Sequence, residues 1–187
     1  MDITVAIATH PPRMGPGGPY ERAVTSVRAQ IYPPTGGIAV ALDEAGDGAA
    51  LTRNKALELV QTEWVAFLDS DDELYPDHLR KLARYARLSG VDVAYSGWDG
   101  PDPTSMFGRA FDPGLLRQTN YIPVTVLART AAVRAAGGFQ PHPDENDDPC
   151  EDWGLWLAMC DQGAKFGHLP VRTWRMNPGG TRGRPDR

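Results

Sequence analysis

The first half of the chain alternates between short apolar runs and longer amphipathic segments. Apolar runs with the length and composition of buried strands lie at 3–9, 38–43, 64–69 and 91–96. Between these runs, apolar residues recur at intervals of three and four, which predicts helices at 20–31, 50–61 and 76–89. Strands that alternate with helices predict an α/β fold in which helices cover both faces of a largely parallel sheet.

The helical spacing also identifies the residues expected in the core. The inward positions are Ala23, Val24, Val27 and Ile31 in the first helix, Ala56, Leu57 and Val60 in the second, and Leu79, Leu82, Ala83 and Ala86 in the third. Pro76 suits the start of the third helix, and Gly90 suits its end.

The second half of the chain is less regular. Residues 97–114 have the composition of a long loop, and 121–128 resemble a strand. A short helix is expected at 130–138, with Thr130 as its N-cap. Another helix is expected at 151–163, followed by a short strand within 165–174. No internal repeat is visible, and a length of 187 residues suits a single domain.

Composition narrows the class of protein. Apolar residues make up 41% of the chain and charged residues 23%, and no apolar run approaches the roughly 18 residues of a membrane span. The N-terminus lacks the basic region and the long apolar block of a signal peptide. Cys150 and Cys160 have neither a metal-binding spacing nor a disulfide framework. We therefore expect a cytoplasmic protein with no membrane span.

Charge is unevenly distributed along the chain. The formal net charge of -5 argues against nucleic acid as a partner. Acidic residues gather at 69–77 and 144–152, whereas arginines are concentrated near the C-terminal end. A site that holds a cation in acids and an anion in arginines would give this distribution, and solvated charged surfaces would give it as well.

Three of the predicted strands end on polar residues, Thr9, Asp43 and Asp69. Ligands of parallel sheets bind outside the carboxyl ends of the strands, so this edge is the expected site. No GxxxxGK[ST] motif occurs, which excludes a P-loop. The loop at 15–20 lacks the last glycine of a dinucleotide fingerprint and has prolines in place of N–H donors. The GGTR at 179–182 resembles a nucleotidyltransferase loop but does not follow the first strand.

The Asp69-Ser70-Asp71 sequence suits a divalent cation. Magnesium-like ions prefer oxygen ligands and are often held by one or two carboxylates, with substrate phosphates and water completing the shell. A dication would offset the repulsion between neighbouring carboxylates, which otherwise raises the pKa of one of them. This requirement explains why a buried strand would end in adjacent acids.

The acidic run allows two other interpretations. An EF-hand is excluded, because Leu74 stands where the loop glycine should be and Arg80 where the closing glutamate should be. An acidic start to the following helix, stabilised by the helix dipole, is the simpler alternative. We favour it for Asp72 and Glu73, and the cation site for Asp69 and Asp71.

Taken together, the motifs resemble those of family 2 glycosyltransferases with the GT-A fold. The matching segments, in the family's order, are ATHPPR (8–13), SVRAQIYPP (26–34), VALDEAGDG (40–48), Arg53-Asn54, AFLDSDDELYP (66–76), VLARTAAVRAAGGF (126–139) and EDWGLWLAMCDQG (151–163). The resemblance covers about residues 3 to 182. It implies a single GT-A domain over 1–187, with a nucleotide-binding half at 1–96, an acceptor-side half at 97–171 and a Gly/Arg-rich tail at 172–187.

The resemblance also implies a donor site. Residues that would line the nucleotide pocket are Thr9, Arg13, Asp43 and Arg53. Asp71 would bind Mn²⁺ or Mg²⁺, and Asp69 would face the ribose or the same ion. Arg175 and Arg182 would contact the diphosphate of the donor. The donor would be a nucleoside diphosphate sugar, with a UDP-sugar as the expected form.

The implied reaction is a single displacement with inversion at the anomeric carbon. Asp152 would act as the general base toward an acceptor hydroxyl, with Glu151 beside it. The acceptor, a glycan, a protein or a small molecule, is not identified by any pattern. From the residues alone, Glu151 and Asp152 also suit a helix N-terminus, where the dipole lowers basicity.

One departure from the family pattern is Asn177, which stands where a histidine is common. The resemblance leaves three alternatives to a hexosyl-type transferase. They are a catalytically inactive nucleotide-sugar binding module, a nucleotidyltransferase, and an acidic calcium-binding surface without a nucleotide.

Overall fold

The computed structural model describes residues 1–100, 108–140 and 150–177. In chain order, the elements are β1 (Ile3–Thr9), η1 (Pro11–Arg13), α1 (Pro19–Arg28), β2 (Ile38–Leu42), α2 (Ala49–Glu58), β3 (Trp64–Asp69), β4 (Glu73–Leu74), α3 (His78–Ser89), β5 (Val93–Asp99), α4 (Pro113–Leu116), β6 (Val126–Arg129), α5 (Thr130–Ala135), α6 (Glu151–Asp161) and β7 (Phe166–Arg175). The longest helix, α3, has 12 residues, and within the described ranges no helix has the length and apolar surface of a membrane span.

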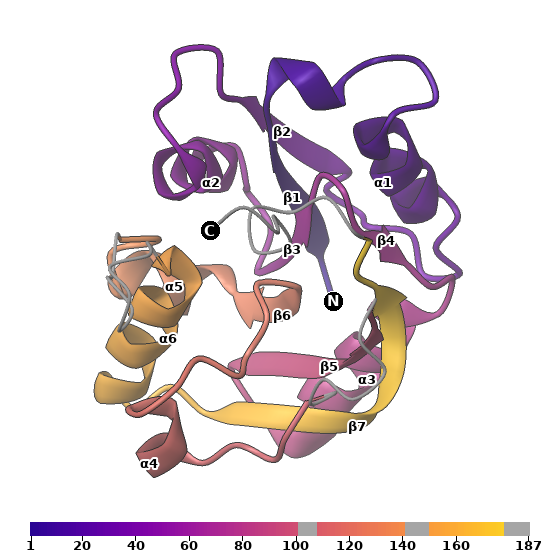
Figure 1. The fold of residues 1–187 in the computed structure, drawn as a ribbon. Coiled ribbons are helices and arrows are strands. Elements are labelled where there is room, and N and C mark those ends of the chain that lie inside the picture. The colour runs from indigo at the N-terminus through magenta and orange to yellow at the C-terminus, as the bar shows by residue number, and fades with distance from the viewer. Residues whose placement is uncertain (101–107, 141–149, 178–187) are drawn as a thin grey trace.

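All the described strands form one mixed sheet in the order β2-β1-β3-β6-β5-β7-β4 (Figure 1). The pairs β1–β2, β1–β3 and β5–β7 are parallel, whereas β6 is antiparallel to both its neighbours and β4 is antiparallel to β7. Five of these seven described strands therefore run in one direction, which confirms the expected α/β fold with a mostly parallel sheet.

Helices cover both faces of the sheet, as the alternating pattern predicted (Figure 1). One buried cluster lies between the sheet and the helices α2, α5 and α6, and it includes Leu57, Val133 and Trp156. The other lies between the sheet and the helices α1 and α3, and it includes Val27 and Leu82. Burying apolar area on both sides stabilises the fold by roughly 25 cal/mol for each Å² removed from water.

The predicted elements are present, but their ends differ, and the structure adds η1, β4 and α4, which were not predicted. The predicted loop at 97–114 includes the end of β5 and the start of α4. The helix α1 ends at Arg28, so Ile31, expected in the core, is 58% exposed. The helix α3 begins at His78 rather than at Pro76. The predicted strand 121–128 is reduced to β6, because pairing with β3 and β5 begins only at Val126. The predicted N-cap of α5, Thr130, is its first helical residue, since Arg129 takes the cap position.

The strand β7 contains an irregularity that changes which face its side chains occupy. Ser96 of β5 pairs with Leu169 of β7, and Trp98 pairs with Trp174. Between these pairs β5 advances by two residues, whereas β7 advances by five. Three extra residues, an odd number, reverse the alternation of side chains. Phe166 therefore packs in the cluster beneath α6, whereas Trp174 packs in the cluster beneath α3.

A side chain of α2 forms two hydrogen bonds with the backbone of the segment that follows α5. The Asn54 amide donates to the Phe139 carbonyl at 2.8 Å and accepts from the Phe139 N–H at 2.9 Å. Phe139 then packs edge-on against Phe67 of β3, with ring centroids 4.9 Å apart. Gly138 allows this approach, because it has a φ of 71° and a Cβ at this position would overlap the Asn54 side-chain oxygen.

Two adjacent glycines provide a matched test of this contact. Gly137 also has a positive φ, of 88°, but a Cβ there meets no atom within 4 Å. We expect Gly137→Ala to lower the free energy of unfolding by about 1 kcal/mol through backbone strain. Gly138→Ala should lower it by about 2–4 kcal/mol, because steric overlap adds to the strain. Urea denaturation measures both values, and equal losses would contradict this role for Asn54.

A buried histidine joins α3 to the sheet. His78 is fully buried, and its Nδ1 lies 2.7 Å from the Thr173 hydroxyl of β7. The same hydroxyl lies 2.6 Å from the Ser96 hydroxyl of β5. Burial lowers the pKa of His78 to about 3. The imidazole therefore stays neutral inside the folded protein at pH values where it is protonated in the unfolded chain.

This pKa shift predicts a loss of stability in acid. Below pH 6.5 the unfolded state binds a proton that folded His78 does not, so stability falls as the pH decreases from about 6.5 to about 3. Between pH 7 and pH 5 the His78 contribution should be about 2 kcal/mol. His78→Asn should therefore lose about 2 kcal/mol less than the unchanged protein over this interval, as measured by urea denaturation. Equal losses would contradict the proposed shift.

Candidate functional site

The carboxyl ends of three parallel strands meet at one edge of the sheet. Ala8 of β1 pairs with Asp69 of β3, and Thr9 pairs with Leu42 of β2. The Asp43 N–H donates to the Thr9 carbonyl at 2.8 Å. The strand ends Thr9, Asp43 and Asp69 therefore lie together, as the parallel pattern predicted.

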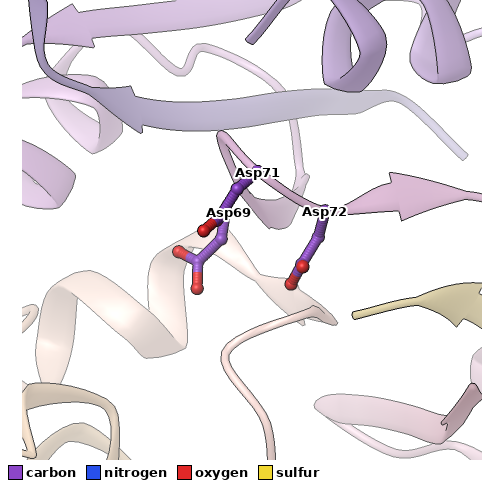
Figure 2. A group of neighbouring side chains, drawn as sticks. All are labelled: Asp69, Asp71 and Asp72. Atoms are coloured by element: carbon purple, nitrogen blue, oxygen red, sulfur yellow. The ribbon is translucent and has the colours of Figure 1, made fainter. Parts of the chain in front are cut away.

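The loop that joins β3 to β4 carries three clustered carboxylates. Oxygens of Asp69, Asp71 and Asp72 lie within 4.8 Å of one another. Figure 2 shows the three side chains projecting to the same side of the loop. Asp71 is 7% exposed and Asp72 is 4% exposed. The loop is tight, because the Asp72 N–H donates to the Asp69 carbonyl at 3.1 Å.

The position of Asp72 corrects its interpretation as part of a helix start. Asp72 precedes the short strand β4, and α3 begins six residues later at His78. Because β4 pairs with β7, the segment that contains Asp72 lies against the sheet and the Asp72 carboxylate is buried. Asp72 therefore belongs to the cluster, while Glu73 begins β4 and stays partly exposed.

Crowding and burial make the cluster electrostatically costly. Burial, and then the Asp69 charge, raise the pKa of Asp71. The same two causes, in the same order, raise the pKa of Asp72 to about 8. Like charges in a medium that solvates them poorly oppose full ionisation. A cation among these oxygens would reverse the balance and favour the ionised forms.

The cluster fits a hard divalent cation. One oxygen of Asp71, Oδ2, is buried and has no hydrogen-bond partner among the described residues. Buried polar atoms normally have a partner, so a missing one indicates a ligand position. Carboxylate oxygens are the ligands that Mg²⁺ and Mn²⁺ prefer. Asp71 and Asp69 would hold such an ion, with Asp72 beside them.

Arg13 and Arg53 contact the cluster from two different elements. Arg13, at the end of η1, lies 2.9 Å from Asp71 Oδ1 and donates to the Ser70 hydroxyl at 3.1 Å. Arg53, on α2, lies 2.5 Å from Asp69 Oδ1 and forms a second ion pair with Glu151. Both residues were predicted from the sequence as parts of the nucleotide pocket.

The first turn of α6 brings the predicted acid pair next to this cluster. The ion pair between Glu151 and Arg53 connects α6 to Asp69. Asp152 is 9% exposed, and its Oδ1 accepts from the Trp153 N–H at 2.9 Å and from the Asn120 amide at 3.1 Å. No sequence motif points to Asn120, because it lies in a loop far from α6 in the sequence.

The remaining nucleotide-side residues lie at the same edge. The Thr9 hydroxyl is buried without a hydrogen-bond partner among the described residues. Asp43 accepts from the N–H groups of Asp47 at 2.7 Å and Gly48 at 3.0 Å. The Gly48 N–H is the main cause that lowers the pKa of Asp43. The Asp43 carboxylate therefore bridges the two ends of the loop between β2 and α2, and these hydrogen bonds favour its ionised form.

Of the two arginines predicted to contact the diphosphate, only Arg175 lies within the described residues. Arg175 ends β7, where it lies opposite Glu73 of β4. It interacts with Tyr75 and Asp99, and in the described structure no ion pair joins it to the aspartate cluster. Arg182 lies outside the described residues. Residues 172–175, expected in the tail, continue β7.

Asn177, just after the end of β7, forms hydrogen bonds with the loop that carries the acids. Its N–H donates to Asp72 Oδ1 at 3.0 Å, and its amide donates to the Asp71 carbonyl at 2.8 Å and to the Glu73 carboxylate at 2.9 Å. Three consecutive residues of the loop are therefore fixed by one side chain and its own N–H. In this chain the residue at the family's histidine position stabilises the loop that carries the aspartates.

Comparison with protein families and curated relatives agrees with this geometry. Residues 26–112 match the model of Glycosyl transferase family 2. The glycosyltransferase TuaG of Bacillus subtilis, named for teichuronic acid biosynthesis, is 42% identical over 55 residues, which are 29% of this chain and 22% of TuaG. The succinoglycan biosynthesis protein ExoO of Rhizobium meliloti is 38% identical over 72 residues, 38% of this chain and 19% of ExoO. The matches thus span about a fifth of these relatives.

Solved structures share the fold over most of the chain. The crystal structure of TarS 1–349 from S. aureus has a TM-score of 0.73 and 20% identity, and it covers 95% of this chain and 61% of its own. The structure of the same TarS segment in complex with UDP-GlcNAc has a TM-score of 0.70 and 19% identity, covering 96% of this chain and 60% of its own. The chain is therefore similar to glycosyl transferase family 2 over residues 26–112, and it shares the GT-A fold of TarS over most of its length.

Proposed function

We propose that this chain transfers a sugar from a nucleoside diphosphate sugar to an acceptor hydroxyl, with inversion and with the help of Mn²⁺ or Mg²⁺. The observation that carries the proposal is the cluster of Asp69, Asp71 and Asp72 at the carboxyl end of β3, beside the ends of β1 and β2. The unpartnered Oδ2 of Asp71 supports a cation within it.

The proposed donor is a UDP-sugar. TarS, which shares the fold, has been crystallised with UDP and with UDP-GlcNAc. In this chain the nucleotide would lie along the strand ends, where the buried Thr9 hydroxyl lacks a partner and Asp43 closes the neighbouring loop. Residues 1–96 would form the donor half and residues 97–171 the acceptor half.

Asp152 is the proposed general base. Two hydrogen bonds to its Oδ1 fix the carboxylate, and Glu151 connects the same helix turn to Arg53 and the cluster. Asp152 would take the proton of the acceptor hydroxyl as its oxygen attacks the anomeric carbon from the face opposite the diphosphate. Arg13 and Arg53 would contact the departing diphosphate. A bound cation supplies charge neutralisation at the leaving diphosphate.

Binding and hydrolysis of candidate donors test this proposal. Thermal shifts with UDP, GDP, dTDP and CDP, each with and without Mn²⁺, identify the base and the need for the cation. We expect UDP with Mn²⁺ to stabilise the protein by about 2.7 kcal/mol at one hundred times its dissociation constant. Asp71→Asn should abolish the Mn²⁺-dependent part of this shift, because it removes a charged ligand.

Turnover is measured as sugar released from UDP-sugars to water or to added acceptors. Asp152→Asn should keep the thermal shift and lower turnover by about 10²–10⁴-fold. Asp161→Asn is the matched control, since Asp161 lies at the other end of α6 in an exposed pair with Arg117. It should change neither value. Release of pyrophosphate from a nucleoside triphosphate would instead indicate a nucleotidyltransferase, and binding without any turnover would indicate a binding module.

A further inference from the structure

Two arginines form ion pairs with the carboxylates that would hold a cation. Arg13 lies against Asp71 Oδ1, and Arg53 lies against Asp69 Oδ1. Only 19% of the Arg13 side chain and 12% of the Arg53 side chain are exposed. These guanidinium groups are therefore largely removed from water, and the ion pairs with the carboxylates offset part of that desolvation.

The two arginines offset part of the repulsion between the clustered acids. Three acids within 4.8 Å would repel one another strongly if all were ionised. The charge of Arg13 lowers the pKa of Asp71, against the larger effect of burial. Arg53 divides its charge between Asp69 and Glu151. The two guanidinium groups thus offset part of the negative charge of the cluster.

A cation and these arginines compete for the charge of the same carboxylates. A divalent ion held by Asp69 and Asp71 would displace the guanidinium groups or lie close to them, and like charges would repel. The displaced arginines would then need another anion. A diphosphate provides one, because its oxygens accept paired N–H donors from a guanidinium group.

We propose that Arg13 and Arg53 transfer from the aspartates to the donor diphosphate when the nucleotide and the cation bind together. This inference rests on the proposed function. Mn²⁺ alone meets carboxylates that are already paired, and the diphosphate alone meets arginines that are already paired. Each ligand removes the obstacle to the other, so their binding is synergistic.

Transfer of Arg53 also affects the helix that carries Asp152. Arg53 connects Asp69 of the cluster to Glu151, the residue before Asp152. When Arg53 moves to the diphosphate, the first turn of α6 loses this connection to Asp69. Arrival of the donor would thereby change the contacts of the helix turn that carries the proposed base.

Titration calorimetry on the full chain tests the exchange. Three affinities are measured in each variant, for Mn²⁺ alone, for UDP alone, and for UDP at saturating Mn²⁺. Arg13→Gln and Arg53→Gln should each bind Mn²⁺ alone about threefold to tenfold more tightly, since a competing charge is gone. Both should bind UDP with Mn²⁺ at least about tenfold more weakly, because an arginine partner of the diphosphate is lost.

Two controls separate charge from geometry and from folding. Arg53→Lys keeps the charge but not the forked donors, so Mn²⁺ alone should bind as in the unchanged protein while UDP with Mn²⁺ binds more weakly. Arg129→Gln removes an arginine that pairs with Glu63 and Asp92 beside Trp64, at the opposite end of β3. It should leave all three affinities unchanged.

The outcomes distinguish this inference from the proposed function. If the unchanged protein binds UDP with Mn²⁺ but both glutamine variants bind Mn²⁺ alone no more tightly, the exchange is wrong and the proposed function stands. If the unchanged protein binds no nucleoside diphosphate at any Mn²⁺ concentration, the proposed function fails, and the exchange fails with it.

Discussion

Negative charge crowded at the end of a buried strand must be compensated, and much of the site follows from this requirement. Asp69, Asp71 and Asp72 share a small volume with little access to water. Burial and the Asp69 charge raise the pKa of Asp72 to about 8, so full ionisation of the cluster needs additional positive charge. Arg13 and Arg53 approach from two different elements and supply part of that charge. Ion pairs therefore link the acidic loop to η1, α2 and α6.

The topology of the sheet supplies the positions that this electrostatic arrangement needs. Because β1, β2 and β3 are parallel neighbours, their polar carboxyl ends lie together at one edge of the sheet. The antiparallel strand β6 returns the chain across the sheet and leads into α5, and Phe139 beyond it is fastened to Asn54. Asn54 follows Arg53 directly, so one turn of α2 anchors the second half of the chain and reaches the acids.

Local patterns in the sequence accounted for most elements, because apolar periodicity is a property of neighbouring residues. They also placed Asp69 and the ends of β1 and β2 at one edge of the sheet, since that edge follows from parallel strands. The burial of Asp72 could not be anticipated, because it depends on pairing of β4 with β7 and on Asn177, 105 residues away. The contact of Asn120 with Asp152 likewise joins distant segments that no short motif connects.

The irregularity in β7 limits how the sequence of this chain can vary. Residues 170–172 are exposed, so many side chains would be tolerated there. The number of residues in this segment is constrained more tightly. Deletion of a single residue would invert the facing of everything downstream, turning Trp174 out of its cluster and Asn177 away from the acidic loop. Over evolutionary time this segment should therefore be free to drift in composition but not in length.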